Sequence, residues 1–417
     1  MKNERESGAP PQEVAKKKKG KGFTPFRQAV VGLPIATVFT VGGLGAYYAH
    51  EHPDQASRLS RKIIGDARTV KLEGYALYLE DQANQLKFDV FGGDTNPFDK
   101  NITPAVQQDR TQSLFRDDPS LFANEPIKPP KPAPLKLPET YTLLTNPNPG
   151  EGVWSVDNLP KTTPEDVLMA KTYIRPDETR PYASVGVLLL DKRRVKLNFV
   201  AGTDNGGAGI IHESEKPNLL AAFNGGFQPQ HASWGMYADG KEYKPLRNNY
   251  ASIVIMNDGT IKMGTWGYGD LTTRTEDMIA VRQNAVLLID NCELTRAATE
   301  RGQDPDTWGY FLPGSREFIT SRSAVGLTKD GDLLVAAGNS ISANALAKAL
   351  KAAGACTAMQ LDINSPYVLT SLYYVLEDGT IMSEKFMQTM NPDSRKFLTR
   401  QTRDFFYITL DETNYKP

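Results

Sequence analysis

The chain has 417 residues, of which 23% are charged and 40% are hydrophobic, with 48 Lys and Arg against 49 Asp and Glu. The net charge of -1 argues against a general nucleic-acid-binding protein, because such proteins use surplus Lys and Arg to neutralise phosphates. Two cysteines are too few for a disulfide scaffold or a structural zinc site. The length would allow two or three domains, but the uneven composition indicates one large folded domain behind segments of other kinds.

The first 49 residues have the pattern of a tail followed by a membrane anchor. Residues 1–28 are rich in Lys, Arg, Gly and Pro, so we expect a disordered basic tail. Residues 29–49 then run for 21 positions without a charged side chain. Because about 20 such residues cross a bilayer, we predict one transmembrane helix. The alternative is a cleavable signal peptide, which Tyr47 disfavours because small residues are needed before the cleavage site.

The charges that flank this span predict its orientation. Six Lys or Arg precede it within about 20 residues and four follow it. The more basic side normally stays in the cytoplasm. We therefore expect a single-pass protein of the inner (plasma) membrane, with a cytoplasmic N-terminus and a C-terminal domain in the periplasm or outside the cell.

Two further segments separate the predicted span from the domain. Apolar residues recur at helical spacing within 50–93, which predicts a juxtamembrane amphipathic helix. It would serve as a partner-binding or oligomerising stalk, or it would lie against its own domain. Residues 94–150 carry 11 of the 28 prolines and are typical of a semi-rigid polyproline II linker. A ligand for a proline-reading module is the alternative interpretation of that segment.

Residues 151–417 alternate short β-rich runs with turn signals, which predicts a single α+β domain with a mixed sheet. Asp-Gly pairs at 258–259, 330–331 and 378–379 predict hairpin turns. One amphipathic helix is expected between Ser342 and Gly354. The expected strands are 185–190, 195–200, 219–223, 252–256, 281–289, 324–328, 333–337 and 358–362.

The first segment with chemical potential is 221–227, where an apolar strand ends in Asn224, Gly225, Gly226 and Phe227. Two glycines beside a side-chain amide expose backbone N–H groups that can hold an anionic oxygen. An ordinary strand-to-loop turn is the alternative, because Asn-Gly pairs often mark turns.

The second segment is 321–326, where Arg322 opens an otherwise apolar strand. A guanidinium group in this position could clamp a phosphate or a carboxylate with two hydrogen bonds. The alternative is a strand-end arginine paired with a structural acid.

The third segment is 358–362, an expected strand that delivers Asp362 at its C-terminal end. Strand ends are where binding sites are often assembled. Asp362 would act as a general acid or base or as a metal ligand. The alternative is a carboxylate that caps a helix or a turn.

Taken together, these segments in this order resemble the phosphodiester glycosidase family. The family's strand ending in Asn-Gly-Gly-Phe matches 224–227, its Arg-Thr-Ala-Ile-Gly strand matches 322–326, and its Asn-Leu-Asp turn matches 360–362. The resemblance runs from roughly 185 to 410. It implies a phosphodiester-glycosidase-like fold for the domain.

The chain departs from the family pattern directly after Asp362. Where the family has Gly-Gly-Gly-Ser, this chain has Ile363, Asn364, Ser365 and Pro366. The replacement adds side chains and removes one backbone N–H group at the proline. It weakens the expectation of a close backbone cradle for phosphate.

The resemblance implies a hydrolase that cleaves a glycosyl phosphodiester or related glycosidic bond in an envelope polysaccharide, such as an exopolysaccharide, or a glycolipid. Asn224 would hold a phosphodiester or sugar oxygen, Arg322 would neutralise phosphate charge, and Asp362 would be the acid/base or nucleophile. The expected substrate-binding residues are Gly225, Gly226, His231, Asn364 and Ser365. The alternative is an inactive domain that binds glycan or serves as an interaction module for envelope proteins.

The remaining candidates are weaker. The four histidines lack metal-ligand spacing apart from His50 and His52, so we predict no histidine zinc site and no resident cofactor. A divalent cation on Asp and Asn oxygens stays open. Cys292 and Cys356 would form one disulfide in an oxidising compartment or remain buried thiols.

Overall fold

The computed structural model describes residues 53–93, 95–98, 134–228, 234–300, 308–309, 318–391 and 393–411. The predicted tail and transmembrane span at 1–49, most of the predicted linker and His231 lie outside these ranges. Within them, no helix combines the length and the apolar character that crossing a bilayer requires.

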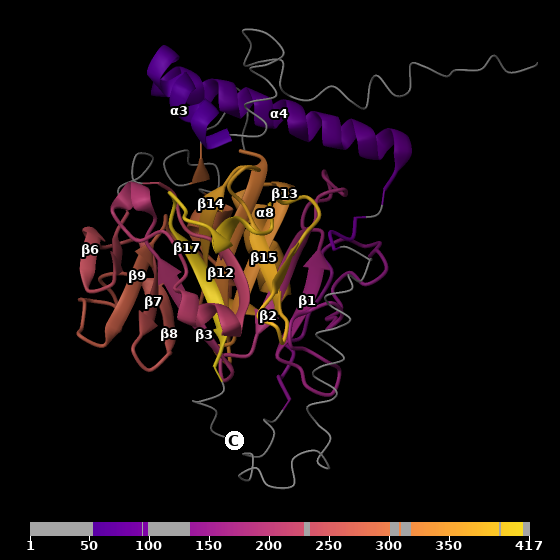
Figure 1. Ribbon diagram of the computed structural model, residues 1–417. Helices are drawn as coiled ribbons and strands as arrows, with labels where there is room; N and C mark the ends of the chain where they lie inside the picture. The colour runs from indigo at the N-terminus through magenta and orange to yellow at the C-terminus, as the bar shows by residue number, and fades with distance from the viewer. Residues whose placement is uncertain are drawn as a thin grey trace, which may run out of the picture.

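Two helices precede the domain and lie across one end of it (Figure 1). They are α3 (Pro53–Ile64) and α4 (Asp66–Phe91). The expected single helix divides at Gly65, which has a φ of 82°, a conformation that glycine adopts at little cost. The Glu73 carboxylate of α4 accepts hydrogen bonds from Ser57 at 2.7 Å and from Arg61 at 3.3 Å, and these bonds join the two helices.

The domain is built from three sheets in which every pairing between the described strands is antiparallel. The prediction of a single mixed sheet is therefore wrong. The seven-stranded sheet has the order β1 (Met169–Ile174), β2 (Val185–Leu190), β13 (Leu333–Ile341), β12 (Thr320–Thr328), β14 (Ala355–Ile363), β10 (Leu287–Asp290), β11 (Glu293–Leu294).

Two five-stranded sheets complete the β structure. The inner sheet has the order β16 (Ile381–Lys385), β15 (Thr370–Val375), β4 (Leu219–Asn224), β17 (Phe405–Leu410), β3 (Val195–Val200). The outer sheet has the order β6 (Lys241–Lys244), β5 (Met236–Ala238), β9 (Met278–Gln283), β7 (Ala251–Met256), β8 (Ile261–Thr265) and stands to one side in Figure 1. The helices among the described residues of the domain are α6 (Arg296–Thr299), α8 (Ala343–Ala352) and the 3-10 turns 203–205, 213–218 and 396–398.

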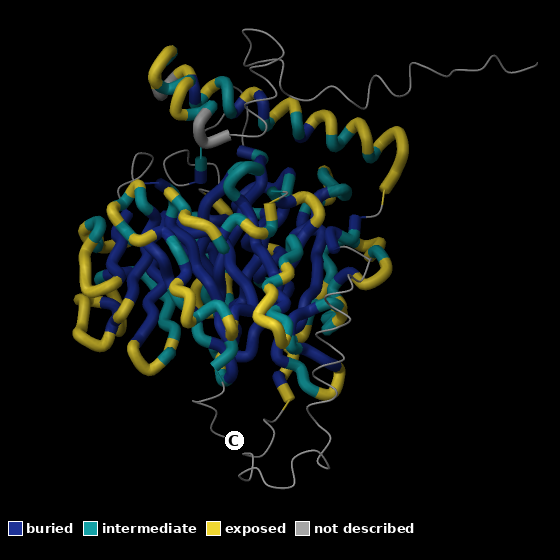
Figure 2. Tube along the Cα trace, viewed as in Figure 1, coloured by how far each residue is buried: buried dark blue, intermediate teal, exposed yellow. Residues whose placement is uncertain are grey.

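The core has a layered arrangement. One apolar cluster joins the seven-stranded sheet to the inner sheet, for example Val335 and Met359 with Phe223 and Leu372. A second cluster fills the other face of the seven-stranded sheet and includes the apolar side of α8. Figure 2 shows this buried interior beneath the exposed surface loops. Because both faces of the seven-stranded sheet are covered, its central strands are apolar on both sides.

The expected strand 281–289 is divided between two sheets. β9 ends at Gln283 in the outer sheet, and β10 begins at Leu287 in the seven-stranded sheet. Between them Asn284 donates to the carbonyl oxygen of Gln360, and Ala285 has a φ of 53°. The change of sheet falls at the buried polar residues Arg282, Gln283 and Asn284, which interrupt the apolar pattern of the expected strand.

The folded unit also extends beyond the expected boundary at 151. Within the segment assigned to the linker, Leu135 is buried and the Tyr141 N–H donates to the carbonyl oxygen of Ala352. Cys292 and Cys356 form a disulfide, which joins the β10–β11 turn to the first half of β14. The strand that carries Asp362 is thereby fixed at its other end.

Candidate active site

Antiparallel pairing brings the three predicted motifs to one end of the sheets. Phe405, the first residue of β17, pairs with Asn224, the last residue of β4. On the seven-stranded sheet, Arg322 near the start of β12 pairs with Ile363 at the end of β14. The Asp362 N–H donates to the Gly225 carbonyl oxygen at 2.9 Å, which connects the two sheets.

The Asn224 side chain is buried and holds neighbouring segments together. Its amide nitrogen donates to the Ser323 hydroxyl at 2.8 Å, and its oxygen accepts the Leu369 N–H at 3.2 Å. The Ser323 hydroxyl in turn donates to the carbonyl oxygen of Asp362 at 2.8 Å. Asn224 thus positions the backbone on either side of Asp362, and both of its N–H groups are already used, the second by Gly225.

The two glycine N–H groups expected to receive a ligand oxygen bind Asp404 instead. Gly225 donates to the Asp404 carbonyl oxygen and Gly226 to its carboxylate, each at 3.0 Å. A Cβ atom at Gly225 would overlap that carboxylate, so only glycine fits there. The chain's own anion therefore occupies this turn.

Asp404 is held by Arg282 in a pair that the sequence did not suggest. The two side chains are 0% and 1% exposed, and their Nε and Oδ2 atoms are 2.8 Å apart. Arg282 also donates to the carbonyl oxygens of Gln283 and Phe227. Full hydrogen bonding offsets the cost of burying both charges. The sequence signal was weak, because these residues are 122 positions apart and match no motif.

Arg322 is fully buried, and its guanidinium group holds neighbouring segments of the chain together. It donates to the carbonyl oxygens of Trp308, Phe318 and Ile341 and to the Gln360 side chain, at 2.6 to 3.1 Å. All three guanidinium nitrogens are thus engaged by neutral acceptors. With the guanidinium fully buried and bonded to these groups, Arg322 does not present the open phosphate clamp that was expected.

Asp362 is the predicted residue whose environment is most suited to chemistry. One carboxylate oxygen accepts the Ile363 N–H at 2.9 Å, and the other accepts from Arg403 at 2.8 Å. Burial raises the pKa of Asp362 to about 6, although the Arg403 charge and the Ile363 hydrogen bond oppose that rise. A carboxyl group with this pKa exchanges a proton in the range in which enzymes work.

Arg403 is the cation of this site and was missed by sequence reasoning. Its guanidinium carbon lies 3.6 Å from the centre of the Tyr367 ring, and its side chain is 19% exposed. Stacking on the ring fixes the guanidinium plane while leaving part of its edge accessible to solvent. Arg403 lies two residues before β17, and the pairing of β17 with β4, which only the folded chain reveals, brings it to the site.

The loop after Asp362 takes a glycine-like conformation without glycine. Asn364 has a φ of 77°, and its carbonyl oxygen accepts the N–H groups of Tyr367 and Val368. Its side-chain oxygen accepts a hydrogen bond from Thr320 at 2.9 Å. Asparagine is one of the few residues that tolerate this region. The loop therefore retains a tight turn despite the replacement of the family's glycines.

Helix α4 covers this loop. Ser365 donates to the Glu80 carboxylate at 3.1 Å, and Asn84 donates to the Ser340 hydroxyl at 3.2 Å. Burial raises the pKa of Glu80, while hydrogen bonds from Ser365 and Asn339 lower it. Of the expected substrate-binding residues, Gly225, Gly226, Asn364 and Ser365 therefore meet at this end of the sheets. His231 falls outside the described ranges.

One buried side chain nearby lacks a partner. Gln228 is 1% exposed, and neither its oxygen nor its nitrogen makes a hydrogen bond. No group of three or more His, Cys, Asp or Glu side chains within the described ranges has the arrangement of a metal site.

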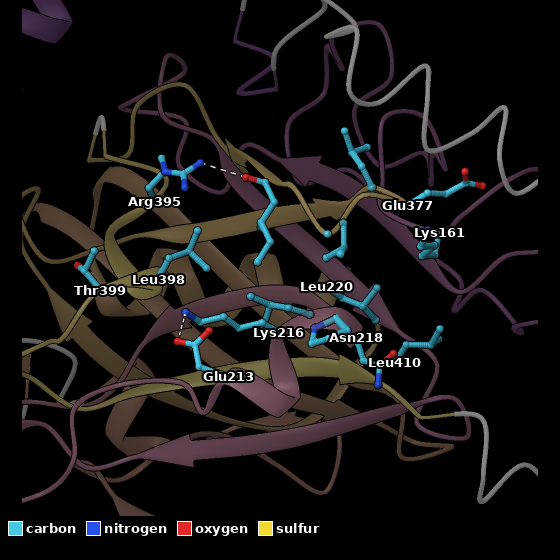
Figure 3. Close-up of a pocket in the computed structure, with 16 residues that line it drawn as sticks. Lys161, Glu213, Lys216, Asn218, Leu220, Glu377, Arg395, Leu398, Thr399 and Leu410 are labelled. Atoms are coloured by element: carbon cyan, nitrogen blue, oxygen red, sulfur yellow. Dashed lines mark hydrogen bonds and ion pairs between the residues drawn. The ribbon is translucent and has the colours of Figure 1, made fainter.

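A pocket of roughly 770 Å³ lies away from these residues, against the start of β4 and the end of β17. Figure 3 shows Lys161, Lys216 and Arg395 at this pocket, with Glu213 paired to Lys216. None of the predicted site residues lines it. The candidate active site and this pocket are thus separate features.

Comparison with solved structures finds folds of low identity. The catalytic domain of zebrafish N-acetylglucosamine-1-phosphodiester alpha-N-acetylglucosaminidase, auto-inhibited by its pro-peptide, is 19% identical, with 60% of this chain and 85% of that chain covered and a TM-score of 0.40. A hypothetical protein from Synechocystis is 12% identical, with 58% and 62% covered and a TM-score of 0.33.

Comparison of sequences gives a more direct result. No curated protein sequence matches the chain. The family model named phosphodiester glycosidase matches residues 217–365, which begin just before β4 and end just after Asp362. The predicted resemblance to the phosphodiester glycosidase family is therefore confirmed over residues 217–365.

Proposed function

We propose that the protein is a membrane-anchored hydrolase that cleaves a glycosyl phosphodiester or related glycosidic bond in an envelope polysaccharide or glycolipid. The class of reaction is supported by the family match over 217–365. The observation that supports a working site is Asp362, which is buried, pairs with Arg403 and has a pKa raised to about 6.

In this proposal Asp362 acts either as the general acid or base of the reaction or as the nucleophile that attacks the sugar. Its ionised form would activate water or act as a nucleophile at the anomeric carbon, and its protonated form would donate to the leaving oxygen. Water supplies the hydroxyl group to the sugar and a proton to the departing phosphate. The pH profile separates these roles, since activity would be lost below about pH 6 for the first and above it for the second.

Arg403 takes the role that was expected of Arg322. It lies beside Asp362, remains partly exposed and is oriented by Tyr367. A guanidinium group at this position would stabilise negative charge on a phosphodiester. Arg322 would support the site from within, because it is fully buried and bonded to backbone carbonyl groups.

A non-catalytic glycan-binding module is the second candidate function. The observation that favours it is the Gly225–Gly226 turn, whose N–H groups are already bound to Asp404. Such a turn offers no donor to an incoming phosphate. A binding module would retain affinity for glycan without releasing sugar.

The deciding experiment is sugar release by the purified full chain from a panel of glycosyl phosphodiesters and aryl glycosides. Asp362→Asn serves as the inactive variant. Asp332→Asn is the matched control, because burial also raises the pKa of Asp332, which lies at the β12–β13 hairpin outside the site. Release by the wild type and the control but not by Asp362→Asn supports the hydrolase. Binding of glycan without release supports the module.

The proposed location places the domain outside the cytoplasm. The disulfide between Cys292 and Cys356 supports it, because structural disulfides persist in oxidising compartments. The charge difference across 29–49 supports the same orientation. A C-terminal alkaline phosphatase fusion, active only outside the cytoplasm, should be active, and activity of a cytoplasmic reporter instead would overturn the orientation.

A further inference from the structure

The exposed apolar side chains of the described residues are concentrated on α3 and α4. Fourteen large hydrophobic residues are exposed, and eight of them lie on these two helices. Figure 2 shows the two helices at the end of the molecule, outside the buried interior of the sheets. The eight residues are Leu59, Ile63, Tyr75, Tyr78, Leu79, Leu86, Val90 and Phe91. An exposed apolar patch of this kind marks an interaction surface.

On α4 these residues form one stripe. Tyr75, Leu79, Leu86 and Val90 follow one another at spacings of four, seven and four residues, which places them on a single helical face. They are 46% to 61% exposed. The four residues thus share one face of the helix, on which the exposed Gln82 separates Leu79 from Leu86.

The opposite face of α4 packs on the domain and carries both polar and apolar side chains, among them Phe88, whose ring lies 6.0 Å from that of Tyr182. Asp81 is buried, accepts from Tyr182 at 2.7 Å and pairs with Arg180 at 3.2 Å. Glu80 accepts from Ser365 on the same side. A helix of a soluble protein normally turns its apolar face inward. Here hydrogen bonds, an ion pair and the Phe88–Tyr182 ring contact fix the helix on the domain, while the stripe of Tyr75, Leu79, Leu86 and Val90 faces outward.

The charges around the stripe are mainly positive. Among the described side chains of α3 and α4, five exposed residues are cations and one, Asp89, is an acid. The exposed cations are Lys62, Arg68, Lys71, Lys87 and Arg58, of which Arg58 is paired with Asp204 of the domain. Lys and Arg beside an apolar helical face, with tyrosines among the apolar residues, are typical of helices that lie in the interface of an anionic bilayer.

The position of α3 in the chain identifies the surface that would cover this face. The predicted span ends at Ala49, four residues before α3 begins at Pro53. Four residues reach at most about 14 Å. The inference rests on the anchoring in the proposed function, since an anchored span keeps α3 next to the lipid headgroups.

We propose that α3 and α4 lie on the outer surface of the bilayer, with Leu79, Leu86 and Val90 inserted at the boundary between headgroups and acyl chains. The Lys and Arg side chains contact anionic headgroups. The candidate active site, which α4 covers, then lies at the end of the domain nearest to the membrane.

The test uses the full chain reconstituted in vesicles of phosphatidylcholine and phosphatidylglycerol. Leu79→Cys and Leu86→Cys are each labelled with an environment-sensitive fluorophore, because the structure contains no free cysteine in its described part. Tyr268→Cys is the matched control, since Tyr268 is 61% exposed on the outer sheet. Fluorescence is quenched either by nitroxide-labelled lipids or by iodide in the water.

We expect the labels at 79 and 86 to be quenched several-fold more by nitroxide lipid than the label at 268, and several-fold less by iodide. Equal accessibility of all three labels to iodide overturns the proposal. Shielding from iodide without quenching by nitroxide lipid also overturns it and indicates contact with a second copy of the chain, which chemical cross-linking would detect.

Two further measurements keep the inference distinct from the proposed function. Resistance of the full chain to extraction by alkaline carbonate reports the anchor by itself. A chain that is extracted refutes the anchoring, whereas a chain that stays in the vesicles with exposed labels refutes only the lipid contact of α4. Sugar release by the labelled variants tests the hydrolase independently of both.

Discussion

Two Asp–Arg pairs lie at the same end of the domain, and they share the same shortest N–O distance but differ in burial. Asp404–Arg282 and Asp362–Arg403 each have an N–O distance of 2.8 Å. The first pair is sealed and has further backbone partners on both side chains. The second is 10% and 19% exposed, and its acid has a pKa of about 6. Burial and extra partners make one pair structural and leave the other available for chemistry.

The largest predicted effect is a loss of activity on changing the Asp362–Arg403 pair. Asp362→Asn should reduce sugar release by a factor of about 10² to 10⁴, the usual contribution of a general acid or base. The variant should remain folded, because asparagine keeps the shape of the side chain and its bond to Ile363. Initial rates and melting temperature measured on the same preparation check both. Full activity in this variant would remove Asp362 from the mechanism.

The fully buried Asp404–Arg282 pair should contribute strongly to the stability of the fold. Asp404→Ala leaves the buried Arg282 charge without its partner and the Gly226 N–H without an acceptor. Breaking a buried pair in this way costs about 3–5 kcal/mol. Denaturant unfolding measures the loss, and Asp393→Ala, at an exposed residue of the same segment, is the control. If the two variants unfold alike, Asp404 does not hold the turn.

The disulfide should contribute a smaller share of the stability. Cys292 and Cys356 are 64 residues apart in the chain, and removing a disulfide costs typically about 2–4 kcal/mol. The variant Cys292→Ser/Cys356→Ser should therefore unfold at lower denaturant concentration than the wild type under oxidising conditions. With a reducing agent present, the two proteins should become similar. An unchanged midpoint under oxidising conditions would contradict the expectation.

The smallest predicted effect is a shift in the pH dependence of the rate of sugar release. Arg403 lowers the pKa of Asp362 against the larger effect of burial, so Arg403→Gln should move the inflection of the pH–rate profile from about 6 to higher pH. Arg400→Gln, which changes an exposed neighbour, should leave it in place. An unchanged inflection in Arg403→Gln would show that another group titrates.

The raised pKa of Asp362 also makes the free energy of unfolding depend on pH, in a direction that can be stated. The pKa of Asp362 is raised from 3.8 to about 6, so the folded chain binds this proton more tightly than the unfolded chain. The contribution of this group to stability is therefore greatest below about pH 4 and declines as the pH rises to about 6. Comparing the pH dependence of unfolding in the wild type and Asp362→Asn isolates the contribution.

Much of the fold could be predicted from local patterns. The strands 185–190 and 195–200 have the expected bounds, and the Asp-Gly pairs at 258–259, 330–331 and 378–379 form hairpin turns. These signals are local, because alternation and turn residues act over a few positions. Whether neighbouring strands run parallel is a long-range property. The expectation of a mixed sheet failed for that reason.

The site could be predicted only in part, for a similar reason. Asn224, Gly225 and Asp362 do meet, because each lies within a recognisable motif at a strand end. Arg403 and Asp404 lie in no motif, and they reach the site because β17 pairs with β4. Arg322 matched the family pattern, but the identity of its acceptors depends on loops far away in the sequence.

The position of α4 across the end of the sheets has a consequence for how substrate would arrive. The helix covers the loop that follows Asp362, and under the proposed function a ligand would approach Asp362 from beside α4. With α4 on a bilayer, that entrance opens along the membrane plane. A lipid-linked substrate would then find the enzyme by lateral diffusion in two dimensions, and the turnover rate would depend on its surface density rather than on its bulk concentration.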